Sequence, residues 1–136
     1  MSNHSAYRTF VDRLSKTKDS AREKSTKKRK SLGLRTAREN LDDLVDPGSF
    51  LEFGAFAVAA QRNRRDYEEL QLETSADGIL TGFCNINEDE VGEDNSHAAA
   101  IIYDYSVLAG SQGFFHHQKL DRICEKAEEF SLPVVI

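Results

Sequence analysis

The chain has 136 residues, of which 39% are hydrophobic and 30% charged, and its net charge is −5. This length suits one domain that buries roughly two-thirds of the surface of its unfolded chain. The longest apolar runs are far below the ~20 residues that a membrane-spanning helix needs, so no membrane partner is predicted. The N-terminus lacks a basic segment followed by an apolar run, so we expect no secretory signal and a cytoplasmic location.

The charge is distributed unevenly. Residues 8–38 carry twelve Lys/Arg against three Asp/Glu, a net of +9, and residues 39–136 carry six against twenty, a net of −14. The basic run 27–30 has no interleaved aromatic residues for base stacking, so nucleic acid is not the expected partner. We interpret residues 1–35 as a basic N-terminal helical arm with a solvated face. A noncatalytic module that binds or oligomerises through this arm is an alternative.

Two helices are predicted before the first strand. Tyr7, Phe10, Val11 and Leu14 follow the spacing of one helical face. Thr36 followed three residues later by Glu39 forms a capping-box pattern, which predicts a helix start, and the Asp-Pro-Gly sequence at 46–48 ends that helix.

Strand composition then predicts an antiparallel hairpin. A short strand is expected at 50–53 and a surface loop or short helix at 62–69. Residues 79–86 and 98–105 have the composition of strands, and the acidic residues 87–95 connect them.

The last forty residues predict a β-α-β unit. The strand at 98–105 leads through a loop to a helix at about 114–130, and residues 132–136 begin a parallel strand. The loop 110–113 then lies at the amino end of the helix, where free backbone N–H groups and the helix dipole favour an anion, although a simple turn is the more common role for such glycines. Both cysteines lie in apolar-patterned segments and are expected to be buried and reduced. The expected apolar face of the helix is Leu120, Ile123, Cys124 and Ala127.

Four stretches in series resemble the carboxyltransferase (β) subunits of biotin-dependent acyl-CoA carboxylases. Their order and spacing agree with the family over about residues 30 to 136. The stretches are 36–52, similar to T-A-R-E-R-I-x-x-L-x-D-P-G-S-F-x-E; 77–82, similar to D-G-V-V-T-G; 104–113, similar to D-F-T-V-x-G-G-S-x-G; and 133–136, similar to P-V-I-x.

Further positions refine this resemblance. His117 and Lys119 stand at the family's H-x-x-K, and Ala109 replaces the first glycine of a pair. The resemblance implies an α/β fold of the crotonase-like (ClpP/crotonase) type, a partial ββα spiral preceded by N-terminal helices. Residues 36–136 would be the start of the carboxyltransferase N-domain, truncated at its C-terminal end.

The same resemblance implies a reaction. Carboxybiotin on a carrier protein would deliver its carboxyl group to the α-carbon of an acyl-CoA of the acetyl-CoA or propionyl-CoA type. A biotin carboxylase or biotin carrier subunit or domain and further copies of the chain would be partners. A carboxyltransferase subunit of a biotin-dependent decarboxylase is the close alternative.

The resemblance also assigns site residues. It places no catalytic residue and no metal ligand in this chain, because the oxyanion-hole glycines are expected beyond Ile136, and the chain alone is expected to be inactive. His116 and His117 fall in the first turn of the predicted helix, where a structural role is expected, and His117 is expected to serve in packing or near CoA. The expected CoA-binding residues are Gly110, Ser111, Gln112, Gly113, Arg35 and Arg38.

Overall fold

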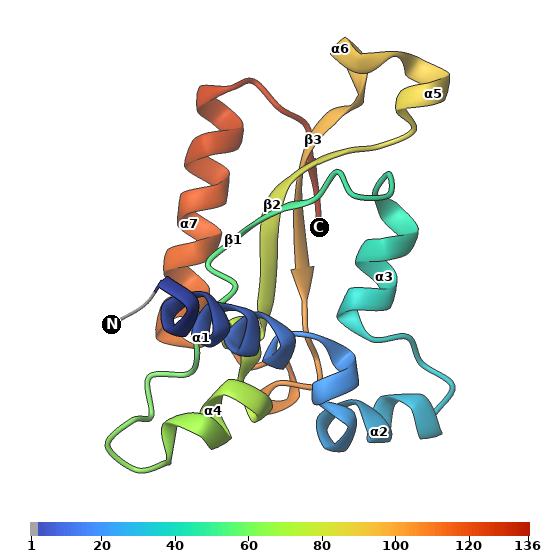
Figure 1. Ribbon diagram of the computed structural model, residues 1–136. Helices are drawn as coiled ribbons and strands as arrows, with labels where there is room; N and C mark the ends of the chain where they lie inside the picture. Colours follow the sequence, from blue (N-terminus) through green and yellow to red (C-terminus); the bar gives the residue numbers. More distant parts are fainter. Residues whose placement is uncertain (1–2) are drawn as a thin grey trace.

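The computed structural model describes residues 3–136 and centres on a four-stranded sheet (Figure 1). The strands, in spatial order, are β1 (Leu51–Phe53), β2 (Ile79–Asn85), β3 (His97–Tyr103) and β4 (Val134–Val135). The β1–β2 and β2–β3 pairs are antiparallel, and the β3–β4 pair is parallel. The hairpin and the β-α-β crossover predicted from the sequence are therefore confirmed.

Helices cover both faces of the sheet. Figure 1 shows α7 (Phe114–Glu129) on one face and α3 (Ala37–Leu44) on the other. Successive residues of a strand point to opposite faces, so β2 and β3 supply both cores. The core under α3 contains Ala37, Leu41, Val45, Ala76, Leu80, Cys84, Ala98 and Ala100, and the core under α7 contains Ile79, Ala99, Ile101, Ile123 and Ala127.

The N-terminal helices lie at one end of the sheet together with α4 (Tyr67–Glu73) (Figure 1). They are α1 (Asn3–Lys16), a 3-10 turn (Asp19–Ala21) and α2 (Glu23–Ser31). Arg22 and Thr26 are buried. The basic stretch is therefore partly packed against the rest of the chain, and Lys27, Lys28 and Lys30 lie on its exposed face.

The apolar face of α1 is only partly covered. Phe10 packs edge-on against Phe56 with ring centroids 5.7 Å apart. The other apolar residues of this face, Tyr7, Val11 and Leu14, are exposed. The helix predicted from their spacing is confirmed, but only one edge of that face makes a close aromatic contact.

The acidic connection between β2 and β3 forms two short helices, α5 (Glu88–Val91) and α6 (Glu93–Ser96). The Asp46 carboxylate accepts hydrogen bonds from the amides of Asn87 and Glu88, each at 2.9 Å. This contact ties the acidic connection to the turn that ends α3. Further 3-10 turns lie at Ser75–Gly78 and Leu108–Gly110.

The buried face of α7 differs from the predicted one. Ile123 and Ala127 are buried, but Cys124 is exposed, so the prediction of two buried thiols is wrong for that residue. The buried stripe instead continues towards the start of the helix through His116 and Lys119. Among residues 3–136, no helix is long and apolar enough to cross a membrane.

The capping box at the start of α3 is present. The Glu39 amide donates to Thr36 Oγ1 at 3.1 Å, and the Thr36 amide donates to Glu39 Oε2 at 2.8 Å. Thr36 Oγ1 also donates to the Asp19 carboxylate. The side chain of Thr36 thus joins the start of α3 to the turn after α1.

Replacing Thr36 by Ala is expected to lower the free energy of unfolding by about 1–2 kcal/mol, the upper part of the range for a lost N-cap, because the bond to Asp19 is lost as well. Urea denaturation would measure it. Thr9→Ala is the matched control, because the Thr9 hydroxyl bonds its own helix on the exposed surface. Equal effects of the two substitutions would show that the cap contributes no stability.

Candidate functional site

A tight turn before β2 holds the amino end of α7. Ala76, Asp77 and Gly78 have φ angles of 55°, 49° and 76°, three left-handed residues in succession. The Asp77 carboxylate is buried and accepts a hydrogen bond from the His116 amide at 2.9 Å. A Cβ atom on Gly113 would lie 2.5 Å from Asp77 Oδ1, so only glycine fits beside this carboxylate.

This arrangement changes the role of the helix end. The sequence pattern indicated that the positive end of α7 would face a ligand anion. The structure places the Asp77 carboxylate there, where it satisfies a free N–H group and complements the helix dipole. An external anion would therefore have to bind beside this end and not on its axis.

The predicted CoA loop, residues 110–113, is partly closed by its own hydrogen bonds. The Gly110 amide donates to the Val107 carbonyl at 2.9 Å, and the Ser111 amide donates to the Leu108 carbonyl at 3.1 Å. Within residues 3–136, the amides of Gln112 and Gly113 have no hydrogen-bond acceptor. Two amides of the loop, and not four, can therefore donate to a ligand.

Ala109, which replaces a glycine of the family pattern, keeps a backbone conformation typical of glycine. Its φ of 55° is left-handed, a conformation that glycine adopts freely and that costs an alanine roughly 1 kcal/mol. The chain keeps the glycine-type turn geometry at this position although the glycine is replaced.

The segment 104–109, which leads into the loop, is held by a buried ion pair to Arg22, the residue just before α2. Arg22 Nη1 lies 2.9 Å from Asp104 Oδ2, and both residues are 3% exposed. Arg22 also donates to the Leu72 carbonyl and to Ser106 Oγ, and Asp104 Oδ1 accepts from the Ser106 amide and hydroxyl. This set of bonds fixes the start of the loop against the basic helix.

One α2 side chain then reaches the loop itself. The Arg29 guanidinium lies 5.8 Å from the centre of the Tyr105 ring, and this ring lies 2.8 Å from where a Cβ on Gly110 would be. Arg29 Nε donates to the Arg35 carbonyl at 2.8 Å. Arg29 was not among the predicted site residues, although its spacing of seven from Arg22 on one helical face could have indicated it.

The two predicted arginines have other partners. Arg35 is exposed and pairs with Asp43 at 2.6 Å, and this hydrogen bond raises the pKa of Arg35 above its ordinary value. Arg38 is buried; it binds Glu52 through two nitrogens at 2.8 and 3.0 Å and donates Nε to the Thr17 carbonyl at 3.0 Å. The Arg38 guanidinium is therefore engaged within the protein.

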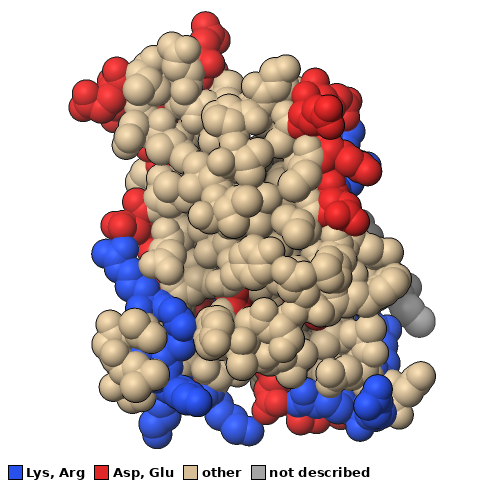
Figure 2. All heavy atoms as spheres, turned by 180° about the vertical axis from the view of Figure 1, so that it is seen from behind, with Lys and Arg blue, Asp and Glu red and all other residues tan. Residues whose placement is uncertain are grey.

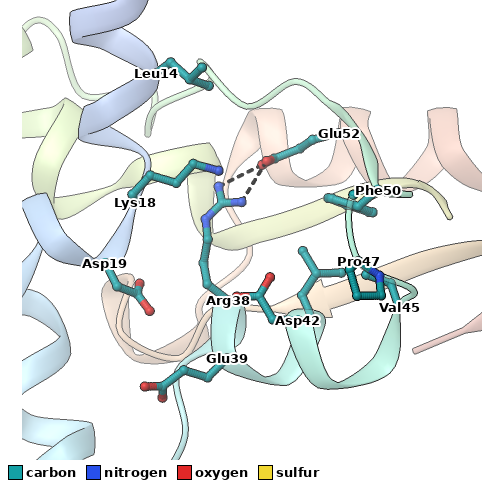
Figure 3. A pocket seen from close by; sticks show the side chains of 12 residues that line it. Leu14, Lys18, Asp19, Arg38, Glu39, Asp42, Val45, Pro47, Phe50 and Glu52 are labelled. Carbon is teal, nitrogen blue, oxygen red and sulfur yellow. Dashed lines mark hydrogen bonds and ion pairs between the residues drawn. The ribbon is translucent and has the colours of Figure 1, made fainter.

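The cavity beside Arg38 is acidic. It has a volume of about 760 Å³ and lies between the end of α1, α3 and β1. Figure 3 shows the Arg38 guanidinium turned towards Glu52. Two basic side chains line the cavity against four acidic ones, so its charge disfavours phosphates. The charged residues are Lys18, Arg38, Asp19, Glu39, Asp42 and Glu52.

The distribution of charge on the surface agrees with a basic region at α2 and an acidic cavity beside Arg38. Seen from behind, basic side chains gather at the end of the molecule where Figure 1 places α2, and acidic side chains flank an uncharged face above them (Figure 2). Within the described residues, no group of three or more His, Cys, Asp and Glu side chains could share a metal ion. The loop beside α2 is thus the best candidate site for an anionic ligand.

No family model matches the chain. The long-chain acyl-coenzyme A carboxylase β4 subunit of Mycobacterium tuberculosis is 32% identical over 91% of this chain, and the propionyl-CoA carboxylase carboxyltransferase subunit of Haloferax mediterranei is 32% identical over 76%. A solved single-chain long-chain acyl-CoA carboxylase is 46% identical over 95% of this chain, with a TM-score of 0.90. The chain belongs to the carboxyltransferase family of biotin-dependent acyl-CoA carboxylases. It spans only 21% and 18% of the two curated relatives and 13% of the solved chain.

A second carboxyltransferase structure supports the fold. Transcarboxylase 12S, solved as a hexamer with methylmalonyl-coenzyme A and methylmalonic acid bound, is 25% identical over 98% of this chain, with a TM-score of 0.79. The match covers 24% of that protein. The α/β, crotonase-like fold implied by the sequence motifs is confirmed for this part of a carboxyltransferase.

The carboxyltransferase motifs meet around one buried lysine. Lys119 is 8% exposed, and its Nζ donates to the Ala76 carbonyl at 2.8 Å and to the Ile79 carbonyl. Burial lowers the pKa of Lys119 to about 8, while Glu52 and Asp77 oppose this shift and Arg38 adds to it. Residues of the T-A-R-E, S-F-x-E and D-G motifs thus act electrostatically on the lysine of the H-x-x-K motif.

The histidine of the H-x-x-K motif is His116, not His117. His116 precedes Lys119 by three residues, as the motif requires, and is fully buried, whereas His117 is exposed. Its Nδ1 lies 3.1 Å from the Asp77 carbonyl, and its Nε2 is buried without a partner in the described part of the chain. Burial lowers the pKa of His116 below its ordinary value, which favours the neutral form of this core ring.

Proposed function

We propose that the protein forms part of an acyl-CoA carboxyltransferase, which moves a carboxyl group from carboxybiotin to the α-carbon of an acyl-CoA of the acetyl-CoA or propionyl-CoA type. The supporting observation is the 46% identity, with a TM-score of 0.90, to a long-chain acyl-CoA carboxylase over 95% of this chain. A biotin carboxylase or biotin carrier subunit or domain, further copies of the chain and a cytoplasmic location belong to the same proposal.

The role of this chain would be to bind and orient the CoA thioester. Carboxybiotin, when bound, supplies the activated carboxyl group. The amides of Gln112 and Gly113 can donate to the pantetheine arm, and Arg29 stands beside the loop as a cation for the phosphates. Such preorganised donors stabilise charge without moving during the reaction. The residues present therefore fit a CoA ligand at this loop better than at the acidic cavity beside Arg38.

A decarboxylase is the second candidate. The methylmalonyl-CoA decarboxylase α subunit of Veillonella parvula is 29% identical over 91% of this chain, close to the values for the carboxylase subunits. Because this chain alone is expected to be inactive, the assay uses the complete carboxyltransferase that contains it, together with a biotinylated carrier protein. A carboxylase would transfer labelled carboxyl from the carrier to the acyl-CoA. A decarboxylase would show net transfer from methylmalonyl-CoA to the carrier. Transfer in neither direction would contradict the proposed reaction.

CoA binding tests the proposed site directly. On titration with CoA, we expect the amide resonances of residues 110–113 to shift, and Arg29→Ala to weaken binding about 5–10-fold by removing a charged contact of roughly 1 kcal/mol. Lys24→Ala is the matched control on the same helix, because Lys24 pairs with Glu73 on the surface. Shifts confined to the cavity beside Arg38, or equal weakening by both substitutions, would place the ligand elsewhere.

A further inference from the structure

The turn at residues 76–78 requires support. Consecutive left-handed residues other than glycine each cost roughly 1–2 kcal/mol, so this conformation persists only where surrounding contacts hold it. Lys119 Nζ donates to the Ala76 carbonyl at the start of the turn and to the Ile79 carbonyl after it. One side chain therefore clamps both ends of a strained segment.

The position of Lys119 is itself tightly defined. A Cβ on Gly54 would lie 3.0 Å from both Cδ and Cε of Lys119, so the backbone of Gly54 packs directly against the lysine stem. Glu52 on β1, Arg38 on α3, and Asp77 and His116 are the charged and titratable groups that face it. The two bonds between Arg38 and Glu52 pair that carboxylate, whereas Asp77 forms no ion pair within the described residues.

The turn at 76–78 contacts the candidate site at residues 110–113. Asp77 accepts from the His116 amide at 2.9 Å, its carbonyl lies 3.1 Å from His116 Nδ1, and its carboxylate lies directly against Gly113. A change in the turn would therefore move the last residue of the CoA loop and the first turn of α7. Lys119 lies one helical turn further along the same buried stripe. The turn at 76–78 therefore contacts α7 at two places, at His116 and at Lys119.

We propose that Lys119 is a positioning residue, which fixes the left-handed turn at 76–78 and, through Asp77, sets the conformation of the loop at 110–113. It does not touch the ligand. The positioning follows from the contacts alone, and its consequence for CoA rests on the proposed function.

The test uses amide exchange and pH titration of the ¹³C,¹⁵N-labelled protein. In the wild type, the Gly113 and His116 amides and Lys119 Cε should titrate together with a midpoint near the lysine pKa of about 8. Lys119→Met keeps the length of the stem but removes the charged donor, so the transition should vanish. Exchange of the His116 amide should accelerate at least tenfold, while the Ala99 amide in the middle of β3 keeps its protection.

Lys126→Met is the matched control, because Lys126 lies on the same helix and pairs with Glu129 at the surface. It should leave both readouts unchanged. A transition near pH 8 that persists in Lys119→Met, or unchanged exchange at His116, would overturn the proposal. If the variant does not fold, the wild-type titration still decides, because different midpoints for Lys119 Cε and the Gly113 amide would also overturn it.

The CoA consequence is measured separately. Lys119→Met should raise the Kd for CoA about fivefold with no change at the β3 amides. If the wild type binds no CoA, the proposed function fails while the exchange and titration results still decide the positioning role. If CoA binds equally well to both proteins although the loop amides differ, the positioning proposal fails for the ligand and the proposed function stands.

Discussion

Replacing Arg22 by Met is expected to lower the free energy of unfolding by about 3–5 kcal/mol, because the Asp104 carboxylate would stay buried without its cation. Arg22 and Asp104 are each 3% exposed and lie 2.9 Å apart, so water cannot replace the lost partner without local opening. Urea unfolding followed by circular dichroism would measure the loss. The loop that begins at Asp104 should lose protection from amide exchange at the same time.

Two further variants separate the ion pair from lost packing. Lys24→Ala removes a surface pair on the same helix and should cost less than about 1 kcal/mol. Adding Asp104→Asn to Arg22→Met should restore at least 2 kcal/mol, because the amide is neutral and can still accept from Ser106. If the double variant were no more stable than Arg22→Met, the loss would have to come from packing of the arginine stem.

The stability of the protein should also rise with pH above 8 because of Lys119. The pKa of Lys119 is about 8 in the folded state, lowered from the 10.5 of an unperturbed lysine. Between these values the unfolded chain binds a proton that the folded chain does not, so the free energy of unfolding increases with pH. The difference of 10.5 less 8, at 1.36 kcal/mol per unit, gives about 3 kcal/mol across this window.

The measurement compares wild type with Lys119→Met. Contributions from all other groups are shared by the two proteins and cancel in the difference. The wild type should gain about 3 kcal/mol relative to the variant from pH 8 to pH 10.5. Parallel stability curves would show that the lysine keeps its ordinary pKa and is more solvated than its burial indicates.

Local signals in the sequence were enough to predict much of the framework. Strand composition predicted the hairpin, and the capping box at Thr36 predicted the start of α3, because each signal depends on residues close together in the chain. The series of motifs predicted the carboxyltransferase family and its crotonase-like fold. These features are determined by the sequence alone.

The burial and the partners of Lys119 follow only from the tertiary structure. A lysine in a polar helix has the pattern of a surface residue, and only packing against Gly54 and the turn at 76–78 shows that it is buried. The Arg22–Asp104 pair joins residues 82 positions apart, and the bonds to Glu52 engage the Arg38 guanidinium within the protein. Local periodicity carries no information about such contacts, because the partner of a buried charge is chosen by how the sheet, the turn and the helices come together in space.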